Sequence, residues 1–215
     1  MSRKSGKKLM DIYRRLFAVY GPQHWWPGET PFEVAVGAIL TQNTNWGNVE
    51  KAISNLRNAH ALHSHDLHRM PAGRLAQLIR PAGYFNIKAK RLKNFISLLV
   101  SDYDGCMKQM KADTQENLRK KLLDVNGIGP ETADSIMLYG LDKPVFVIDA
   151  YTKRVLSRHN IMNHDESYDA FQGLFHRQLK RELRLYNEYH ALFVRVCKNH
   201  CKTKPHCDGC PLEGV

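Results

Sequence analysis

The amino-acid sequence predicts an all-α protein, and three observations lead to this fold class. Apolar residues recur at spacings of three and four along most of the 215 residues, which is the period of an amphipathic helix. A single run resembles a strand, Val145–Ile148, and it is short enough to lie unpaired. The segments between the periodic stretches are short as well. We therefore expect about ten helices joined by short connections.

The apolar stripes place these helices along the chain. The N-terminal stripes are Ile12, Leu16, Val19 and Tyr20, then Phe32, Ala35, Val36, Ile39 and Leu40, then Val49, Ala52, Ile53 and Leu56. The central stripes are Leu75, Leu78 and Ile79, ended by Pro81, then Ala89, Leu92, Phe95, Ile96 and Leu99, then Leu118, Leu122 and Val125. A long apolar helix over residues 186–196 precedes a cluster of cysteines.

Composition excludes several classes of protein. Hydrophobic residues make up 43% and charged residues 25%, as in a globular domain. No run approaches the roughly 18–20 apolar residues that cross a bilayer. No apolar segment follows the basic start Met1–Lys4, as it would in a secretory signal. We therefore expect a cytoplasmic protein that is neither secreted nor bound to a membrane.

The charge balance indicates a polyanionic partner. Lysine and arginine total 32 against 21 aspartates and glutamates, which gives a formal net charge of +11. Such an excess attracts nucleic acid and makes binding depend on salt. Basic residues also serve as a solubilising surface, so composition alone leaves both interpretations open.

The segment over residues 122–133 joins two helical patterns through Gly127-Ile128-Gly129. The glycines allow a tight turn, Pro130 suits the first position of the next helix, and Ile128 would pack inward. Exposed N–H groups at a helix start bind phosphate. An ordinary helix–helix turn is the alternative, but the whole pattern favours a helix-hairpin-helix phosphate grip. Its expected DNA-binding residues are Gly127, Ile128, Gly129 and Thr132.

Three further motifs accompany the hairpin: GAILTQNT at residues 37–44, GYFNIKA at 83–89 and VIDAY at 147–151. In this order they resemble the helix-hairpin-helix (HhH-GPD) DNA glycosylases of the endonuclease III type, over residues 25–212. The resemblance implies two helical lobes around a cleft that receives a base flipped out of the duplex. We expect one lobe over residues 29–143, with the hairpin, and another over residues 1–28 plus 144–215, with a C-terminal cysteine loop. It also implies a monomer that binds double-stranded DNA with a damaged base and is located at the nucleoid.

The resemblance also identifies a departure at Glu131. Bifunctional members carry a lysine there, which attacks the sugar and cleaves the backbone through an imine, and a carboxylate cannot form that imine. Asp149 matches the aspartate shared across the superfamily. The resemblance therefore implies a monofunctional glycosylase without abasic-site lyase activity, in which Asp149 stabilises an oxocarbenium-like state or orients water. Asp149 could instead cap the helix that begins at Ala150, and both roles are compatible.

Three early tryptophans point to the substrate. Trp25, Trp26 and Trp46 resemble aromatic residues of the 3-methyladenine DNA glycosylase branch, which stack on the flipped base. An N3- or N7-alkylated purine is cationic and is attracted to an aromatic face, although a tryptophan is as often a core residue. Glu131 could line the same pocket or be a solvated acid of the first helical turn. We expect hydrolytic release of alkylated purines, chiefly 3-methyladenine.

Gln42 and Asn43 follow an apolar helix and are assigned to the DNA-binding set. The resemblance makes Gln42 a candidate to fill the gap left by the extruded base, because its amide offers both donors and acceptors. Capping the helix that begins at Trp46 is the alternative. The basic residues Lys88, Lys90, Arg91 and Lys93 could face phosphates or form a solvated helix face.

Other functions fit the same fold. A glycosylase for uracil, mismatched thymine or an oxidised base would need polar groups in its pocket to assist a neutral leaving group. A non-catalytic damage sensor would keep the hairpin but would have no use for Asp149. A bifunctional lyase is disfavoured by Glu131.

Four of the five cysteines lie in the last 19 residues: Cys197, Cys201, Cys207 and Cys210, with the spacing C-x3-C-x5-C-x2-C. Such a group indicates one tetrahedral ion or a cubane cluster rather than disulfides. Its end, residues 207–211, resembles the endonuclease III cluster loop, which implies a [4Fe–4S] cofactor in a structural role. The family spacing is C-x6-C-x2-C-x5-C, so Cys197 would have to supply a ligand, and His200 or His206 could compete for that place. Zinc and a metal-free loop are the alternatives.

Overall fold

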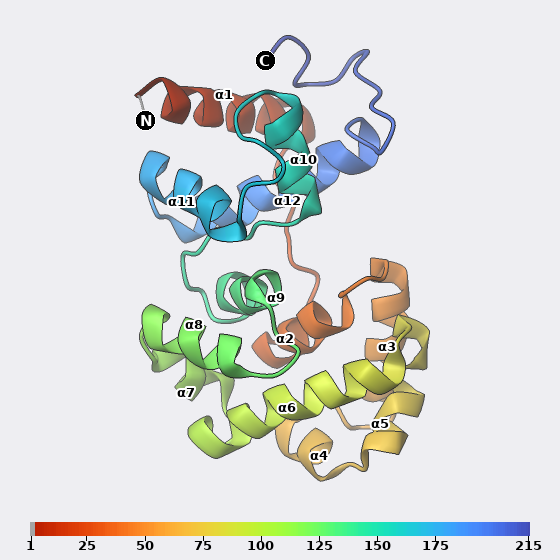
Figure 1. The fold of residues 1–215 in the computed structure, drawn as a ribbon. Helices are drawn as coiled ribbons and strands as arrows, with labels where there is room; N and C mark the ends of the chain where they lie inside the picture. Colours follow the sequence, from red (N-terminus) through yellow and green to blue (C-terminus); the bar gives the residue numbers. More distant parts are fainter. Residues whose placement is uncertain (1–2) are drawn as a thin grey trace. The chain divides into compact units, whose positions relative to one another are not determined.

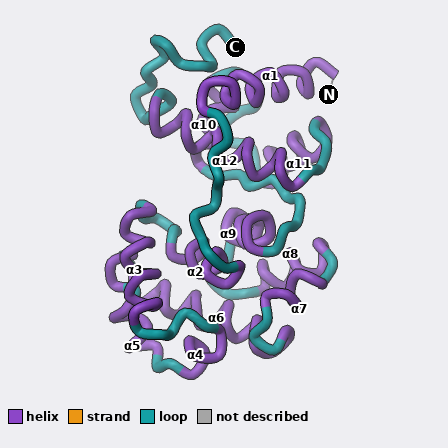
Figure 2. The backbone as a smooth tube through the Cα atoms, turned by 180° about the vertical axis from the view of Figure 1, so that it is seen from behind, coloured by secondary structure: helices purple, strands orange, loops and turns teal. Residues whose placement is uncertain are grey.

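The computed structural model describes residues 3–215, with side chains from Gly6 onward, and this part of the chain is helical without a β-strand (Figures 1 and 2). It contains twelve α-helices, a 3-10 turn and a π-helical turn. The predicted all-α class is therefore confirmed. None of these helices is both long and apolar enough to cross a membrane.

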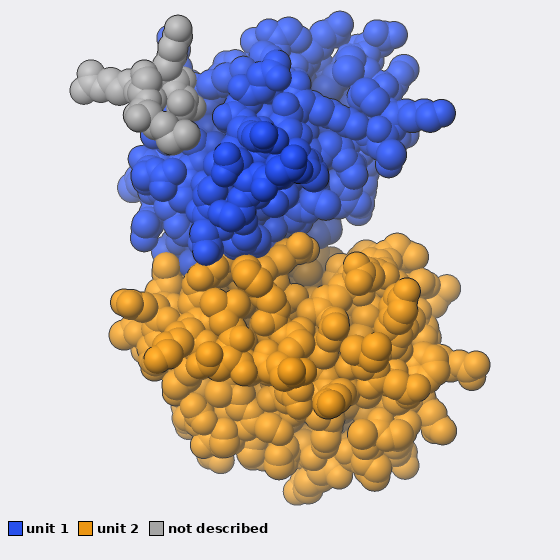
Figure 3. Space-filling view, viewed as in Figure 1, with its two compact units in different colours: residues 1–25, 144–215 blue, residues 26–143 orange. Residues whose placement is uncertain are grey.

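The chain divides into two compact units, coloured separately in Figure 3. The first unit contains residues 1–25 and 144–215, and the second contains residues 26–143. We expected the boundary after residue 28, and the second unit begins at Trp26. A chain that leaves one unit and returns to it places residues from both termini in the same core.

The second unit is built around α2 and α6. Its elements are α2 (Pro31–Leu40), α3 (Trp46–Asn58), α4 (Ser64–Arg69), α5 (Ala72–Leu78), η1 (Arg80–Ala82), α6 (Phe85–Tyr103), α7 (Met107–Ala112), α8 (Gln115–Asp124), α9 (Pro130–Ser135) and η2 (Ile136–Gly140). Thr30 caps α2, because its side chain accepts the Glu33 N–H at 3.1 Å, and Pro31 opens the helix. Helix α2 is buried from Phe32 to Leu40, while α6 packs on α4 and α5 (Figure 1).

The first unit is built around α12. Its helices are α1 (Arg3–Tyr20), α10 (Ala150–Arg158), α11 (Tyr168–Gln178) and α12 (Leu183–Asn199). Helix α12 packs against α1 and α10, and aromatic rings fill its core. The rings of Phe146 and Phe175 stack at 3.6 Å, and Tyr189 meets both rings edge-on. In α1, Ile12 and Leu16 are buried as predicted, but Val19 is exposed, because it lies in the last turn before the helix ends at Tyr20.

The strand-like run Val145–Ile148 forms an extended segment, and its backbone is hydrogen-bonded to side chains of α11 instead of to another strand. The Phe146 N–H donates to His176 Nε2 at 3.1 Å, and Phe146 O accepts from Gln172 Nε2 at 2.8 Å. The Ile148 N–H donates to the Tyr168 hydroxyl at 3.3 Å. The four side chains of this run are buried, which explains why the run is apolar. Its backbone polar groups are hydrogen-bonded to α11 side chains, so no sheet is needed to satisfy them. This segment leads directly into Asp149.

Candidate active site and nucleic-acid interface

The hairpin connects α8 to α9 in the second unit. Ile128 is 5% exposed, and its N–H donates to Val125 O at 3.0 Å. Gly127 has φ +97°, and a Cβ at this position would overlap Arg91 Cγ. Gly129 is the N-cap of α9 and Pro130 its first residue. Ile128 therefore fills the inside of the turn, and the glycine lets the arginine side chain cross its outer face.

Gln42 is tied to this hairpin in the structure. Its Nε2 donates to Gly127 O at 3.1 Å and to Thr132 Oγ1 at 2.9 Å, while Arg91 donates to its Oε1. The alternative role of Gln42 as a helix cap is wrong, because Asn45 caps α3 through its own side chain. Gln42, Thr132 and Arg91 thus form one polar group around the turn.

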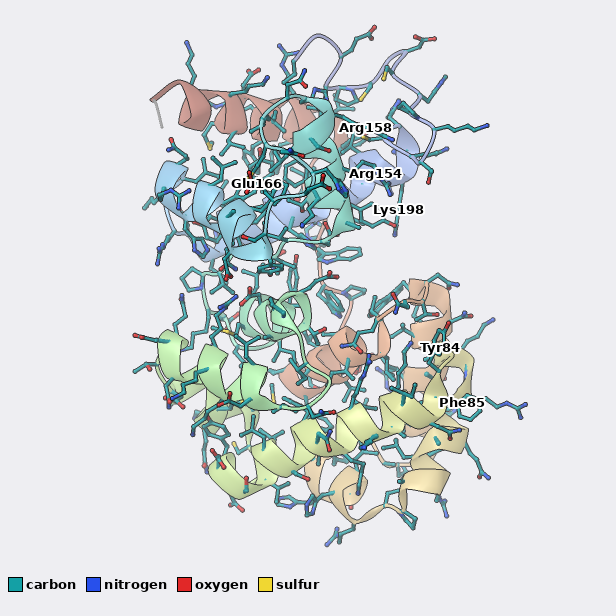
Figure 4. All side chains as sticks on the ribbon, in the orientation of Figure 1. Tyr84, Phe85, Arg154, Arg158, Glu166 and Lys198 are labelled. Carbon is teal, nitrogen blue, oxygen red and sulfur yellow. The ribbon has the colours of Figure 1, made fainter. Side chains whose placement is uncertain are left out.

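Asn43 and Tyr84 are exposed residues of the second unit, and both have left-handed backbones. Asn43 has φ +52° and Tyr84 has φ +44°. Tyr84 is 69% exposed at the start of α6, next to Phe85 (Figure 4), and Ile87 in the first turn is 54% exposed. An aromatic side chain in this conformation and exposure contributes little to folding. The motif GYFNIKA drew attention to this turn, but its periodicity gave no sign that Tyr84 faces solvent.

Two of the basic residues expected on a solvated or phosphate-facing side of α6 serve the fold instead. Lys88 is 1% exposed, and its Nζ donates to Leu40 O at 2.8 Å and to Ala82 O at 2.7 Å. Burial lowers the pKa of Lys88 to about 8, and the neighbouring Arg91 adds to the effect. Lys93 donates to three carbonyl oxygens at the end of α4. The expectation that Lys88 and Lys93 face phosphates or solvent is therefore wrong, because their ammonium groups donate to backbone carbonyls that would otherwise lack a donor.

Two of the three tryptophans form an aromatic cluster in the second unit. Trp26 meets Trp46 edge-on at 5.3 Å and Tyr139 at 5.1 Å between ring centroids. Gly37 lies beneath, where a Cβ would come within 3.4 Å of both indoles. Tyr139 belongs to the π-helical turn η2, a feature that is frequent at functional sites. The sequence did not identify Tyr139, because nothing in its local pattern marks a π-turn.

Trp25 belongs to the first unit. The ammonium of Lys198, on α12, lies 5.7 Å from the centroid of its ring, within cation–π range. Glu131 is exposed in the first turn of α9, where a negative charge is favoured by the helix dipole.

Asp149 occupies the N-cap of α10 and has a second partner. Its Oδ1 accepts the Thr152 N–H at 2.7 Å, and its Oδ2 lies 3.4 Å from His190 Nε2. The carboxylate is 12% exposed. Burial acts to raise its pKa, but His190 and the Thr152 N–H together outweigh that effect and hold the pKa of Asp149 below its usual value. The sequence predicted the cap role of Asp149, which the structure confirms, but not its contact with His190, which is buried on α12.

The four C-terminal cysteines lie in the last turns of α12 and in the loop that follows this helix. Cys197 is buried in the last turns of α12, and its Sγ lies 3.7 Å from Tyr151 O. Cys201, Cys207 and Cys210 line a cavity of about 370 Å³ together with His200 and other loop residues. A hydrogen bond from Cys197 lowers the pKa of Cys201 to about 6, and the same bond raises the pKa of Cys197.

Two arginines of α10 connect it to the cysteine loop (Figure 4). Arg154 donates to Cys201 O at 3.2 Å. Arg158 donates to Cys201 Sγ at 3.3 Å and to Lys202 O at 2.6 Å, and its other terminal nitrogen reaches Thr203 O at 2.8 Å. The loop has little regular structure of its own, so these bonds set its position relative to α10. Within residues 3–215, no three cysteine, histidine or acidic side chains lie close enough to hold a single ion.

Comparison with known proteins identifies the class to which this fold and these residues belong. Residues 36–181 match the family described as HhH-GPD superfamily base excision DNA repair protein. The chain therefore belongs to the HhH-GPD superfamily.

Its relatives include a curated archaeal protein of nearly the same length. The "Putative DNA repair glycosylase MJ1434" of Methanocaldococcus jannaschii is 46% identical over 214 residues, which are 99% of this chain and 97% of that protein. Endonuclease III of Sulfolobus acidocaldarius is 29% identical over 183 residues, 85% of this chain and 79% of that enzyme.

Solved structures show the same fold. The 3-methyladenine DNA glycosylase MagIII of H. pylori, bound to 1,N6-ethenoadenine, has a TM-score of 0.77 and 30% identity, over 90% of this chain and 97% of that one. A trapped endonuclease III–DNA covalent intermediate has a TM-score of 0.82 at 21% identity, over 99% of this chain and 94% of that one. The second likeness concerns the fold alone.

Proposed function

We propose that this protein is a monofunctional DNA glycosylase that hydrolyses the N-glycosidic bond of alkylated purines in double-stranded DNA. The observation that carries the proposal is the ionised carboxylate of Asp149, which is oriented at the N-cap of α10 and favours a cationic transition state. In the sequence, Glu131 stands where bifunctional members have lysine, so that position offers no amine for an imine.

The reaction follows from the charges. When the bond between C1′ and the base nitrogen breaks, its electron pair leaves with the purine, and positive charge grows on the sugar. A cationic alkylated purine becomes neutral as it leaves, so it needs no acid. The Asp149 carboxylate stabilises the developing cation and orients water, whose oxygen bonds to C1′ while its proton passes to solvent.

The aromatic residues support an alkylated purine as the substrate. Trp26, Trp46 and Tyr139 offer π-faces close together in the second unit, and a cationic base gains about 0.5–2 kcal/mol on such a face. MagIII, at 30% identity, is a 3-methyladenine DNA glycosylase. A glycosylase for uracil, mismatched thymine or an oxidised base is the second candidate, because endonuclease III and a thymine/uracil-DNA glycosylase are also relatives.

The DNA contacts we propose start from the hairpin. The N–H groups of its turn and of the first turn of α9 are suited to a phosphate, and Arg91 adds a cation across Gly127. Gln42 is already hydrogen-bonded to this turn, so phosphate binding and the insertion of its side chain into the duplex would be linked. Tyr84 and Ile87 present exposed apolar surface at the start of α6 that could pack on bases.

We also propose that the cysteine loop binds a [4Fe–4S] cluster. The thiols of Cys201, Cys207 and Cys210 line one cavity of about 370 Å³, and Cys197 is buried in the last turns of α12, from which this loop continues. Four thiolates are the usual ligand set of a cubane cluster. When bound, the cluster would supply structural cross-linking of the loop, since base hydrolysis moves no electrons.

A substitution at Asp149 tests the reaction. Asp149→Asn keeps the helix cap but removes the charge, so single-turnover base release from 3-methyladenine duplex should fall by about 10²–10⁴-fold with little change in DNA affinity. Asp165→Asn, an exposed aspartate of the same unit, is the control. Unchanged turnover in Asp149→Asn would remove the proposed role.

Borohydride trapping tests the monofunctional assignment. The parent protein should form no covalent adduct with damaged duplex, whereas Glu131→Lys restores an amine at the family position and should become trappable. Efficient trapping of the parent would show that another amine acts as nucleophile. A panel of alkylated, deaminated and oxidised duplexes, assayed in parallel, identifies the base, and faster release of a neutral lesion would favour the second candidate.

The metal content of anaerobically purified protein tests the cofactor. We expect about four irons per chain and a brown colour. Stoichiometric zinc, or a colourless protein without iron, would reject the cluster.

A further inference from the structure

His190 is a buried histidine to which the proposed reaction gives no role. It lies on α12, is 4% exposed and belongs to the same compact unit as Asp149. Its Nε2 faces Asp149 Oδ2 at 3.4 Å. A polar ring inside a helix interface is costly unless it has partners, so its position next to the carboxylate calls for an explanation.

The two oxygens of Asp149 are contacted from two different helices. Oδ1 accepts the Thr152 N–H of α10, and Oδ2 faces the ring nitrogen supplied by α12. One contact alone would leave the carboxylate plane free, because rotation about the Cβ–Cγ bond is soft. Two contacts define that plane. A carboxylate has about four lone-pair sites, so the remaining ones can still face a reacting atom.

The same contact controls the charge of the carboxylate. Burial favours the neutral acid, which could neither stabilise a sugar cation nor orient water as a base. His190 is the largest influence that opposes burial and lowers the pKa of Asp149, ahead of the Thr152 N–H. Cys197, also on α12, is a further titratable group near Asp149, and Arg154 of α10 lies near that cysteine.

We propose that His190 is a positioning residue of the active site: through Nε2 it fixes the plane of the Asp149 carboxylate and keeps the carboxylate an anion for base hydrolysis. This inference rests on the proposed glycosylase function. It assigns a task in catalysis to α12, the helix that also carries Cys197 and continues into the cysteine loop.

Paired substitutions at His190 separate positioning from packing. His190→Phe keeps a ring of similar size without the donor, and His190→Gln keeps an amide N–H near the place of Nε2. Single-turnover base release should fall about 10- to 100-fold in His190→Phe, with the DNA dissociation constant within about twofold, and His190→Gln should recover most of the rate. Tyr189→Phe, which loses only its hydrogen bond to Leu9 O, should lower the melting temperature without slowing base release.

A double-mutant cycle tests whether His190 acts through Asp149. The variant carrying both Asp149→Asn and His190→Phe should release base no more slowly than Asp149→Asn alone. Equal losses in His190→Gln and His190→Phe, or multiplied losses in the double variant, would overturn the inference, because either result indicates packing or an independent role.

A measurement without substrate keeps this inference distinct from the proposed function. In protein carrying ¹³C-labelled aspartate, the NMR titration of Asp149 should show a pKa below the usual range. That pKa should rise in His190→Phe and stay low in His190→Gln. If the parent protein released no damaged base, the proposed function would fail while this titration still tested the contact. An Asp149 pKa that is the same in the parent and in His190→Phe would refute the contact itself.

Discussion

Lys88 gives a quantitative prediction about stability and pH. Its ammonium group is buried between α2, η1 and α6, and its pKa falls from the ordinary 10.5 to about 8. Below pH 8 both the folded and the unfolded chain carry this proton, so the group adds no pH dependence. Between pH 8 and 10.5 the folded chain has lost the proton and the unfolded chain keeps it, so stability rises with pH.

The magnitude follows from the same two values. At about 1.4 kcal/mol for each pH unit, the interval from 10.5 to about 8 amounts to about 3 kcal/mol in the free energy of unfolding. Lys88→Met removes the titrating group. Relative to Lys88→Met, the parent protein should therefore gain up to about 3 kcal/mol across this window.

Urea unfolding at a series of pH values measures this difference. Lys90→Met, an exposed lysine on the same helix, is the matched control and should run parallel to the parent. Comparing variants cancels the contribution of tyrosines and cysteines that titrate in the same range. If the Lys88→Met and parent curves ran parallel through the window, the depressed pKa of Lys88 would be refuted.

Three further predictions concern the hairpin and the cysteine loop. Gly127→Ala places a methyl group against Arg91 at φ +97°, so DNA affinity should fall in binding titrations, and unchanged affinity would argue against the hairpin as a DNA contact. Asp134 is fully buried and receives two bonds from Arg119, so Asp134→Ala should lower stability by about 3 kcal/mol in thermal melts; a loss below 1 kcal/mol would contradict a buried pair. Arg158→Gln removes bonds to the cysteine loop, so trypsin should cleave that loop sooner, whereas identical digestion would show that other contacts hold it.

The helices and the hairpin could be predicted because their signals are local. Apolar spacing located α1, α2, α3, α5, α6, α8 and α12 but not α4, α7 or α11. Pro130 with the flanking glycines marked the turn before α9. The cap role of Asp149 also followed from its neighbours along the chain, since an N-cap bonds within its own first turn. These features depend on residues three or four positions apart.

The remaining features depend on residues far apart in sequence. His190 reaches Asp149 only because α12 packs on α10, and Lys88 is buried only because two carbonyls outside α6 need donors. Tyr139 joins Trp26 through a π-helical turn that no apolar period reveals. Sequence periodicity places a residue on a helix face, but it does not identify what lies opposite.

Hydrogen exchange in the extended segment before Asp149 can report on the packing of that segment against α11. The amide hydrogens of Phe146 and Ile148 end on an imidazole and a phenol of α11, so each exchanges with solvent only when that helix moves away. The rate of deuterium uptake at these two amides would therefore report how often the segment that leads into Asp149 separates from α11. A substitution on α11 that speeds this uptake should therefore lower the rate of base release, although it alters no group that touches the nucleotide.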